Sequence, residues 1–199
     1  QAKDDKMKGL LYRFGGNPKN AADFVLDDNI DALATLARQN PNEVGKSGCG
    51  TIFTFVVNFN KPDMLELLLA QGVRVPQVVT GCRTYLWRNP SLTRRLLETD
   101  MDPNLPNWQW VTPLHNIAQV NPMFRRNSEH AKEARKNERA LRETLVDLFL
   151  EFGANIDALD EEYRSTPLGW AAREGQEDMV DILLNRGADP MGGESWATP

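Results

Sequence analysis

The chain has 199 residues and carries 23 Lys and Arg against 28 Asp and Glu, which gives a formal net charge of −5. Proteins that hold nucleic acid by its phosphates are usually basic, so this balance argues against a general nucleic-acid binder. Hydrophobic residues make up 41% and charged residues 26%, as expected of a folded chain. No stretch reaches the roughly 20 apolar residues that cross a bilayer, and we expect no membrane insertion.

A polar, lysine-rich extension, residues 1–19, begins the chain. Two short helices are predicted after it, Asn20 to Leu26 and Ile30 to Gln39. The second has Ile30, Leu33 and Leu36 on one face, and Asn40-Pro41 ends it. We interpret residues 20–47 as an atypical N-terminal repeat, because a complete repeat unit follows directly.

Residues 48–80 form that unit. Thr51 opens it and Gly72 closes it 21 positions later, with Met64, Leu67 and Leu68 at the i, i+3 and i+4 spacing of a helical stripe. The threonine recurs at Thr84, 33 positions after Thr51. Only 28 positions then separate Thr84 from the next anchor threonine, Thr112, so the unit over 81–108 is shortened.

The unit over 109–162 opens with Thr112-Pro113-Leu114-His115, but Gly153 follows the threonine by 41 positions rather than 21. An insertion, residues 121–140, therefore separates its two helices. In the last complete unit, 163–194, Thr166 and Gly187 are again 21 positions apart. Residues 195–199 begin a further unit, so we expect the array to be truncated there.

These residues resemble the ankyrin repeat. The motifs are Thr112 to His115, Gly153-Ala154-Asn155-Ile156-Asp157 and the run from Thr166 to Pro190. The resemblance covers about Asp28 to the C-terminus and implies an all-α ankyrin-repeat solenoid of stacked helix pairs with projecting hairpin loops. It also implies that His115 bonds neighbouring loops. Glycines 72, 153 and 187 are expected to end helices in the left-handed conformation.

In ankyrin-like arrays the partner usually meets the hairpin tips and the exposed face of the first helix. The resemblance therefore implies a protein-binding module, by itself monomeric, with another protein as its partner. Trp108 and Tyr163 are the sharpest candidates, since Trp, Tyr and Arg are common hot spots. Packing of Trp108 on the next hairpin is an equal alternative, and for Trp110 and Trp196 we expect such packing. The full predicted set is Asn58, Phe59, Arg83, Trp108, Gln109, Gln119, Tyr163 and Arg173.

The insertion is rich in basic residues. From Arg125 to Arg142 there are seven basic and three acidic side chains. We expect a solvated extension of the second helix. The alternative is a basic prong for an acidic partner or nucleic acid, for which strong salt dependence would be diagnostic. The candidate patch comprises Arg125, Arg126, Lys132, Arg135, Lys136 and Arg139.

Residues that carry chemistry are sparse. The histidines His115 and His130 lack metal-ligand spacing, and neither Cys49 nor Cys82 has a base nearby in sequence. We expect no catalytic, cofactor or metal site, two free thiols and a reducing, cytoplasmic location. One alternative stays open: the chain is a regulatory or targeting segment of a larger protein whose catalytic domain lies outside these residues.

Overall fold

The computed structural model describes residues 21–44, 46–47, 50–79, 89–107, 110–119 and 129–194, with side chains except at 42–43, 46–47, 50–51 and 129–136. Apart from one pair of two-residue strands, the described elements are helices, so the predicted all-α class is confirmed. They fall into two compact units, residues 1–74 and 75–199, each with its own core. Within the described ranges, none of the helices combines the length and apolarity needed to cross a membrane.

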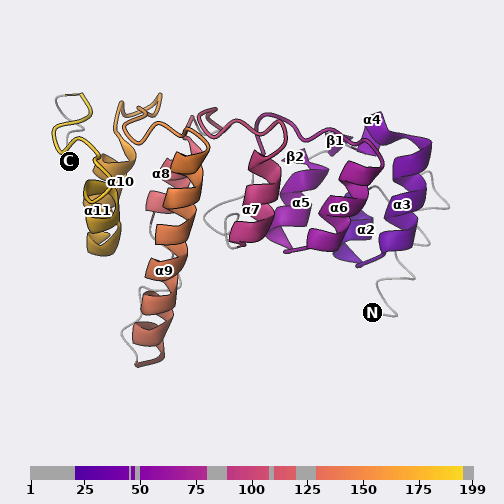
Figure 1. Cartoon of the computed structure of the whole chain (residues 1–199), viewed down its shortest axis with the longest axis horizontal. Helices are drawn as coiled ribbons and strands as arrows, with labels where there is room; N and C mark the ends of the chain where they lie inside the picture. The colour runs from indigo at the N-terminus through magenta and orange to yellow at the C-terminus, as the bar shows by residue number, and fades with distance from the viewer. Residues whose placement is uncertain are drawn as a thin grey trace, which may run out of the picture. The chain divides into compact units, whose positions relative to one another are not determined.

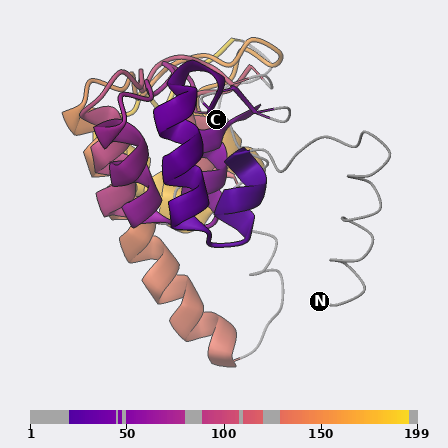
Figure 2. The same ribbon diagram turned by 90° about the vertical axis from the view of Figure 1, so that its right-hand side faces the viewer.

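Unit 1 contains two helix pairs (Figures 1 and 2). Helix α2 packs against α5 and α3 against α6, while β1 and β2 form a short antiparallel hairpin. Val25, Leu33, Phe53 and Leu68 are fully buried between the pairs. The elements are α2 (Ala21–Leu26), α3 (Ile30–Gln39), α4 (Pro41–Val44), β1 (Lys46–Ser47), β2 (Gly50–Thr51), α5 (Ile52–Asn58) and α6 (Pro62–Ala70).

The buried faces of α3 and α6 differ from those predicted. Ile30 is 38% exposed because it occupies the first position of α3, beside the turn, and the face is instead centred on Leu33 and Ala37. In α6 the buried positions include Leu65, whereas Leu67 is only half-buried. The buried face therefore includes Ala37 in α3 and Leu65 in α6, which the predicted stripes left out, while Leu33, Met64 and Leu68 lie on it as predicted.

Unit 2 arranges its helices in two layers (Figure 1). Helix α8 packs on α10, whereas α9 contacts both α7 and α11. The threonine anchors cap the first helices, since the Thr166 hydroxyl accepts a hydrogen bond from the Gly169 amide at 3.1 Å. The elements are α7 (Pro90–Leu97), α8 (Pro113–Ala118), α9 (Glu129–Glu151), α10 (Pro167–Arg173) and α11 (Glu177–Leu184).

The glycines that end the second helices adopt the predicted left-handed conformation. The φ angles are 76° at Gly72, 84° at Gly153 and 86° at Gly187. After Gly153, the Ala154 amide donates to the Phe149 carbonyl at 2.9 Å, a Schellman-type closure. These angles disfavour any residue with a Cβ, so the glycines set where each hairpin loop begins.

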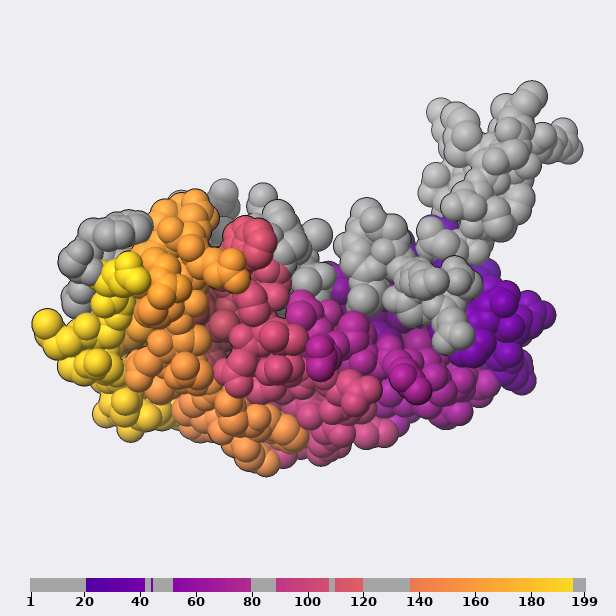
Figure 3. All heavy atoms as spheres, turned by 90° about the horizontal axis from the view of Figure 1, so that it is seen from above, coloured from indigo at the N-terminus to yellow at the C-terminus, as the bar shows by residue number. Residues whose placement is uncertain are grey.

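Successive loops of unit 2 are joined by side chains. The Asn104 carboxamide accepts from the Asn155 amide at 2.6 Å and donates to the Gly153 carbonyl at 2.9 Å. One repeat later, Asp157 accepts from the Asp189 amide at 2.9 Å. Seen from above, the orange residues of unit 2 lie directly beside its yellow C-terminal residues (Figure 3). The hairpins therefore form a continuous ridge within this unit.

Helix α9 is one continuous helix of 23 residues. Its first residues belong to the insertion, so the expectation that the insertion extends the second helix is confirmed from Glu129 onward. In Figure 1 its start projects beyond the other helices of unit 2. Residues 121–128 lie outside the described ranges.

Candidate partner-binding site

Asp160 organises the hairpin that precedes α10. Its buried carboxylate accepts hydrogen bonds from the amides of Tyr163 at 2.6 Å and Ser165 at 3.0 Å, and from the Trp170 indole at 3.0 Å. Burial by itself raises the pKa of the Asp160 carboxyl, but these donors outweigh it and leave the pKa below its usual value. Because the backbone donors come from one loop, the ionised carboxylate fixes the loop on α10.

Tyr163, Trp170 and Arg173 gather beside this loop, and we name them the aromatic–arginine cluster. The Tyr163 and Trp170 rings meet edge to face with centroids 6.3 Å apart. The Arg173 guanidinium carbon lies 4.9 Å from each ring centroid. Both rings are half-buried and Arg173 is exposed. The sequence prediction named Tyr163 and Arg173, and the structure brings them together through Trp170, which it had not singled out.

His115 supports the cluster from the preceding repeat. Its ring lies 5.8 Å from that of Trp170, and its Nε2 lies 3.0 Å from the Ser165 carbonyl. A carbonyl only accepts, so Nε2 carries the proton and Nδ1 faces the Thr112 hydroxyl at 2.8 Å. Burial lowers the pKa of this imidazole, despite the favourable contacts with Ser165 and Asp160. The predicted loop-bonding role of His115 is confirmed.

Trp110 departs from its predicted packing role. Its side chain is 53% exposed, and its backbone lies in the left-handed region with φ of 64°. The Trp110 amide donates to the Asn107 carbonyl at 3.0 Å. Arg164, in the same repeat position, also has a positive φ of 53°. The left-handed backbone and the exposed indole thus occur together at Trp110, which a sequence comparison with other repeats does not reveal.

Two of the predicted contacts lie in unit 1. Asn58 ends α5 and is half-buried, and its Oδ1 is buried without a hydrogen-bond partner. Phe59 follows it and is 48% exposed. Arg83, Trp108 and Gln109 lie outside the described residues, as do Trp196 and both cysteines, Cys49 and Cys82.

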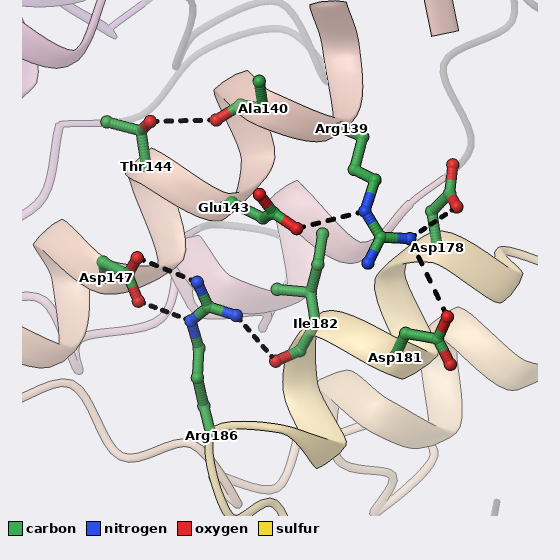
Figure 4. Close-up of polar contacts among 9 residues, drawn as sticks. All are labelled: Arg139, Ala140, Glu143, Thr144, Asp147, Asp178, Asp181, Ile182 and Arg186. Atoms are coloured by element: carbon green, nitrogen blue, oxygen red, sulfur yellow. Dashed lines mark hydrogen bonds and ion pairs between the residues drawn. The ribbon is translucent and has the colours of Figure 1, made fainter. Parts of the chain in front are cut away.

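The candidate basic patch is described at one side chain, Arg139. Arg125 and Arg126 lie outside the described ranges, and the side chains of Lys132, Arg135 and Lys136 are not described. Arg139 faces carboxylates, with Glu143 at 3.0 Å, Asp178 at 2.7 Å and Asp181 at 3.7 Å (Figure 4). Its charge is therefore largely compensated within the molecule.

Arg186 makes a second link between the same helices. Its guanidinium pairs with both carboxylate oxygens of Asp147 and donates to the Ile182 carbonyl at 3.0 Å (Figure 4). On the other side of α9, Glu151 pairs bidentately with Arg94 at 2.6 and 2.7 Å. Charged contacts thus connect α9 to both neighbouring second helices.

Arg142, one of the basic residues counted around the insertion, is buried and only 7% exposed. It donates to the Gln119 carbonyl at 2.9 Å and to the Gln176 side chain at 3.1 Å, and pairs with Glu138 at 3.5 Å. Burial lowers the pKa of this guanidinium, although Glu138 opposes the effect. Arg142 therefore anchors the half-buried Gln119, a predicted contact, to the turn between α10 and α11.

Across the described residues, no three His, Cys, Asp or Glu side chains lie close enough to hold a metal ion. The aromatic–arginine cluster contains neither a nucleophile nor a paired base. The cluster instead offers groups that suit binding, namely two aromatic faces and one guanidinium beside a rigid loop.

Comparison with known proteins gives a family and several relatives. Ankyrin repeats in three copies match residues 87–192. The palmitoyltransferase Hip14 of Drosophila melanogaster is 35% identical over 97 residues, which are 49% of this chain and 12% of that protein. The palmitoyltransferase ZDHHC17 of Homo sapiens is 34% identical over 97 residues, again 49% of this chain and 12% of that protein. The palmitoyltransferase ZDHHC13 of Mus musculus is 50% identical over 46 residues, which are 23% of this chain and 7% of that protein. The chain thus matches a small part of each relative.

The family match covers more than half of the residues of this chain and coincides with the helix pairs of unit 2. This chain therefore belongs to the ankyrin repeat family.

Proposed function

We propose that this chain is a protein-binding module and that a segment of its partner docks on the aromatic–arginine cluster. The observation that carries this proposal is Arg173. Its guanidinium lies 4.9 Å from two ring centroids, and no described carboxylate forms an ion pair with it. A guanidinium stacked on rings keeps its N–H donors available to a partner's carboxylate or carbonyl oxygen.

Preorganisation supports the same proposal. Asp160 holds the loop that carries Tyr163 by hydrogen bonds to two of its amides, and the Trp170 indole is fixed by the same carboxylate. A site whose side chains are already ordered loses less conformational entropy on binding. Tyr, Trp and Arg are also the residue types in which interface energy concentrates.

A second proposal concerns the protein of which this chain is a part. The matched relatives are named palmitoyltransferases, and the match covers 12% of the two longest-matching ones reported above. We infer that this chain recruits a protein partner for a larger protein of that kind, with any acyl transfer performed outside these residues. The full coding sequence tests this inference: a reading frame that contains no transferase domain contradicts it and leaves the binding proposal intact.

A capture experiment tests the binding site. The immobilised chain is exposed to its native lysate beside a Tyr163→Ala/Arg173→Ala variant, and bound proteins are quantified by mass spectrometry. A partner that uses the cluster should bind the variant at least about tenfold more weakly, as expected for two hot-spot residues.

The matched control is Arg164→Ala, because Arg164 is exposed in the same hairpin but pairs with Glu194 at 3.0 Å. Circular dichroism confirms that all variants are folded. Equal capture by the wild type and the double variant would show that the partner binds elsewhere.

A further inference from the structure

Two junctions between successive hairpins of unit 2 share the same backbone contact. The Trp110 carbonyl accepts a hydrogen bond from the Glu161 amide at 3.3 Å, and one repeat later the Arg164 carbonyl accepts from the Glu194 amide at 3.1 Å. Trp110 and Arg164 each lie two residues before an anchor threonine, and both have positive φ angles. By this contact, Trp110 and Glu161 are equivalent to Arg164 and Glu194.

The side chains at the two junctions differ. At the second junction the Arg164 guanidinium pairs with Glu194 at 3.0 Å, so the chain itself supplies both charges. At the first junction a tryptophan stands in the place of the arginine. Among the described side chains, none forms an ion pair with Glu161 and none stacks on the Trp110 ring. Both side chains are exposed, Trp110 by 53%, and we name the two residues the open junction.

Hydrogen bonds hold the backbone of the open junction. The Trp110 amide donates to the Asn107 carbonyl at 3.0 Å, and the Asn107 amide donates to the Val111 carbonyl at 2.9 Å. Together with the Glu161 contact, these bonds fix the place from which the indole projects. A ligand that covers the indole therefore pays little entropy for ordering the backbone beneath it.

The charge of the surrounding loops favours a cationic ligand. Residues 99–107, 153–165 and 187–194 contain eight acidic residues and one basic residue, Arg164, which is already paired. Tryptophan is the aromatic side chain that attracts a cation most strongly. The apolar stem of a lysine or arginine can also lie along the indole while its charged end stays in water. A basic side chain therefore suits both groups of the open junction.

We propose that the open junction binds an arginine or lysine side chain of a protein partner. The cation rests on the Trp110 indole and pairs with the Glu161 carboxylate, as Arg164 pairs with Glu194 at the next junction. This inference rests on the proposed role of the chain as a protein-binding module, but not on the aromatic–arginine cluster. The exposed charge of that cluster is the cation Arg173, which attracts the opposite kind of group.

Titration of the whole chain with a defined basic peptide tests the proposal. The probe is a blocked peptide of alternating glycine and arginine, and its control carries citrulline, which keeps the shape of arginine without the charge. The chain is labelled with 5-fluorotryptophan, and the fluorine NMR signal of Trp110 is the one that Trp110→Phe removes. The arginine peptide should shift this signal saturably, and the citrulline peptide should bind at least about threefold more weakly.

Variants of the open junction give a second readout by isothermal titration calorimetry. Trp110→Ala and Glu161→Gln should each weaken binding of the arginine peptide about threefold or more. Trp110→Arg should weaken it as well, because the new guanidinium pairs with Glu161 inside the chain. The matched control is Glu177→Gln, which removes the same charge from an exposed position at the start of α11 and should leave the affinity unchanged.

Equal affinity for the arginine and citrulline peptides, or unchanged affinity after Glu161→Gln, overturns the proposal. The Tyr163→Ala/Arg173→Ala variant keeps the open junction and should bind the arginine peptide like the wild type. Loss of binding in that variant also overturns the proposal, because the cluster would then be where the peptide binds. None of these results decides the capture experiment above, so the two proposals can fail separately.

Discussion

His115 and Ser165 lie 50 positions apart in the sequence, and the imidazole of one donates to the carbonyl of the other at 3.0 Å. The contact joins the first helix of one repeat to the hairpin of the next. Its proton is required on Nε2, while Nδ1 accepts from the amide of Thr112 at 3.3 Å and faces its hydroxyl. A second proton on Nδ1 would face the Thr112 amide donor, so the contact depends on the neutral ring.

The first prediction follows from the lowered pKa of His115. As the pH falls, His115 is protonated at a higher pH in the unfolded chain than in the folded chain. The free energy of unfolding should therefore be highest above about pH 6.5 and fall as the pH drops below that value. One proton gives a slope of at most about 1.4 kcal/mol per pH unit. Urea titrations between about pH 8 and pH 5 measure it.

The chain contains two histidines, and the second, His130, provides the control. His115→Gln should flatten the pH dependence in this range, whereas His130→Gln should keep it. A wild-type stability that is constant across the range would contradict the assignment.

The second prediction concerns Asp160. Asp160→Asn places an NH₂ group against the Ser165 amide or the Trp170 indole, both of which are donors. We expect a loss of about 2 kcal/mol in unfolding free energy at neutral pH. Because the folded pKa is lowered, the contribution is present above about pH 3.9 and disappears as the pH falls through the folded value. Urea unfolding followed by tryptophan fluorescence detects both effects, and the exposed neighbour Glu162→Gln should change neither.

The third prediction concerns the buried arginine. Arg142→Met removes the partner of Glu138 and leaves the Gln119 carbonyl without this donor, so we expect a loss of roughly 3 kcal/mol. Glu138→Leu, alone and combined with Arg142→Met, measures the coupling energy between these two side chains. Thermal and urea unfolding of the single and double variants form a complete cycle.

Arg139→Met is the comparison for that cycle. Arg139 lies one turn earlier on α9, and its side chain is 33% exposed with carboxylates that remain solvated. Its removal should change the urea midpoint little. An equal loss in the two single arginine variants would mean that burial is not what distinguishes Arg142.

The fourth prediction concerns the backbone conformation at Trp110. A left-handed backbone is costly for a residue with a Cβ, so Trp110→Gly should raise the free energy of unfolding by about 1 kcal/mol. Trp110→Ala keeps that cost and should bring no gain. Differential scanning calorimetry of the three proteins measures the effect, and a Gly variant less stable than the Ala variant would refute it.

The repeat anchors explain why much of the fold was predictable. Threonines that cap helices and glycines that end them act locally, so spacing alone locates the helix pairs. The same positional logic predicted Tyr163 and Arg173 as contacts, and the structure places the two side chains together. It missed Trp170, because a tryptophan inside an apolar helix is usually core, and it missed Asp160, because a loop aspartate is usually solvated.

Arg142 and Trp110 show two different reasons why a prediction from the sequence was incomplete. Arg142 stands three residues before Leu145 and seven before Phe149, so it lies on the buried stripe of α9, and extending that stripe backward would have found it. Trp110 had no comparable signal. Its exposure follows from a backbone angle that side-chain type does not encode, since glycine is the usual residue for it.

The backbone-amide contacts between successive loops of unit 2 have a direction. The later repeat provides the amide donors, Asn155 and Asp189, and the earlier repeat provides the acceptors, Asn104 and Asp157. The repeat between these two junctions therefore carries one such donor, the Asn155 amide, and one such acceptor, the Asp157 carboxylate. A whole repeat can be duplicated or deleted in evolution without leaving either group unpaired, whereas a change of a few residues disturbs both junctions.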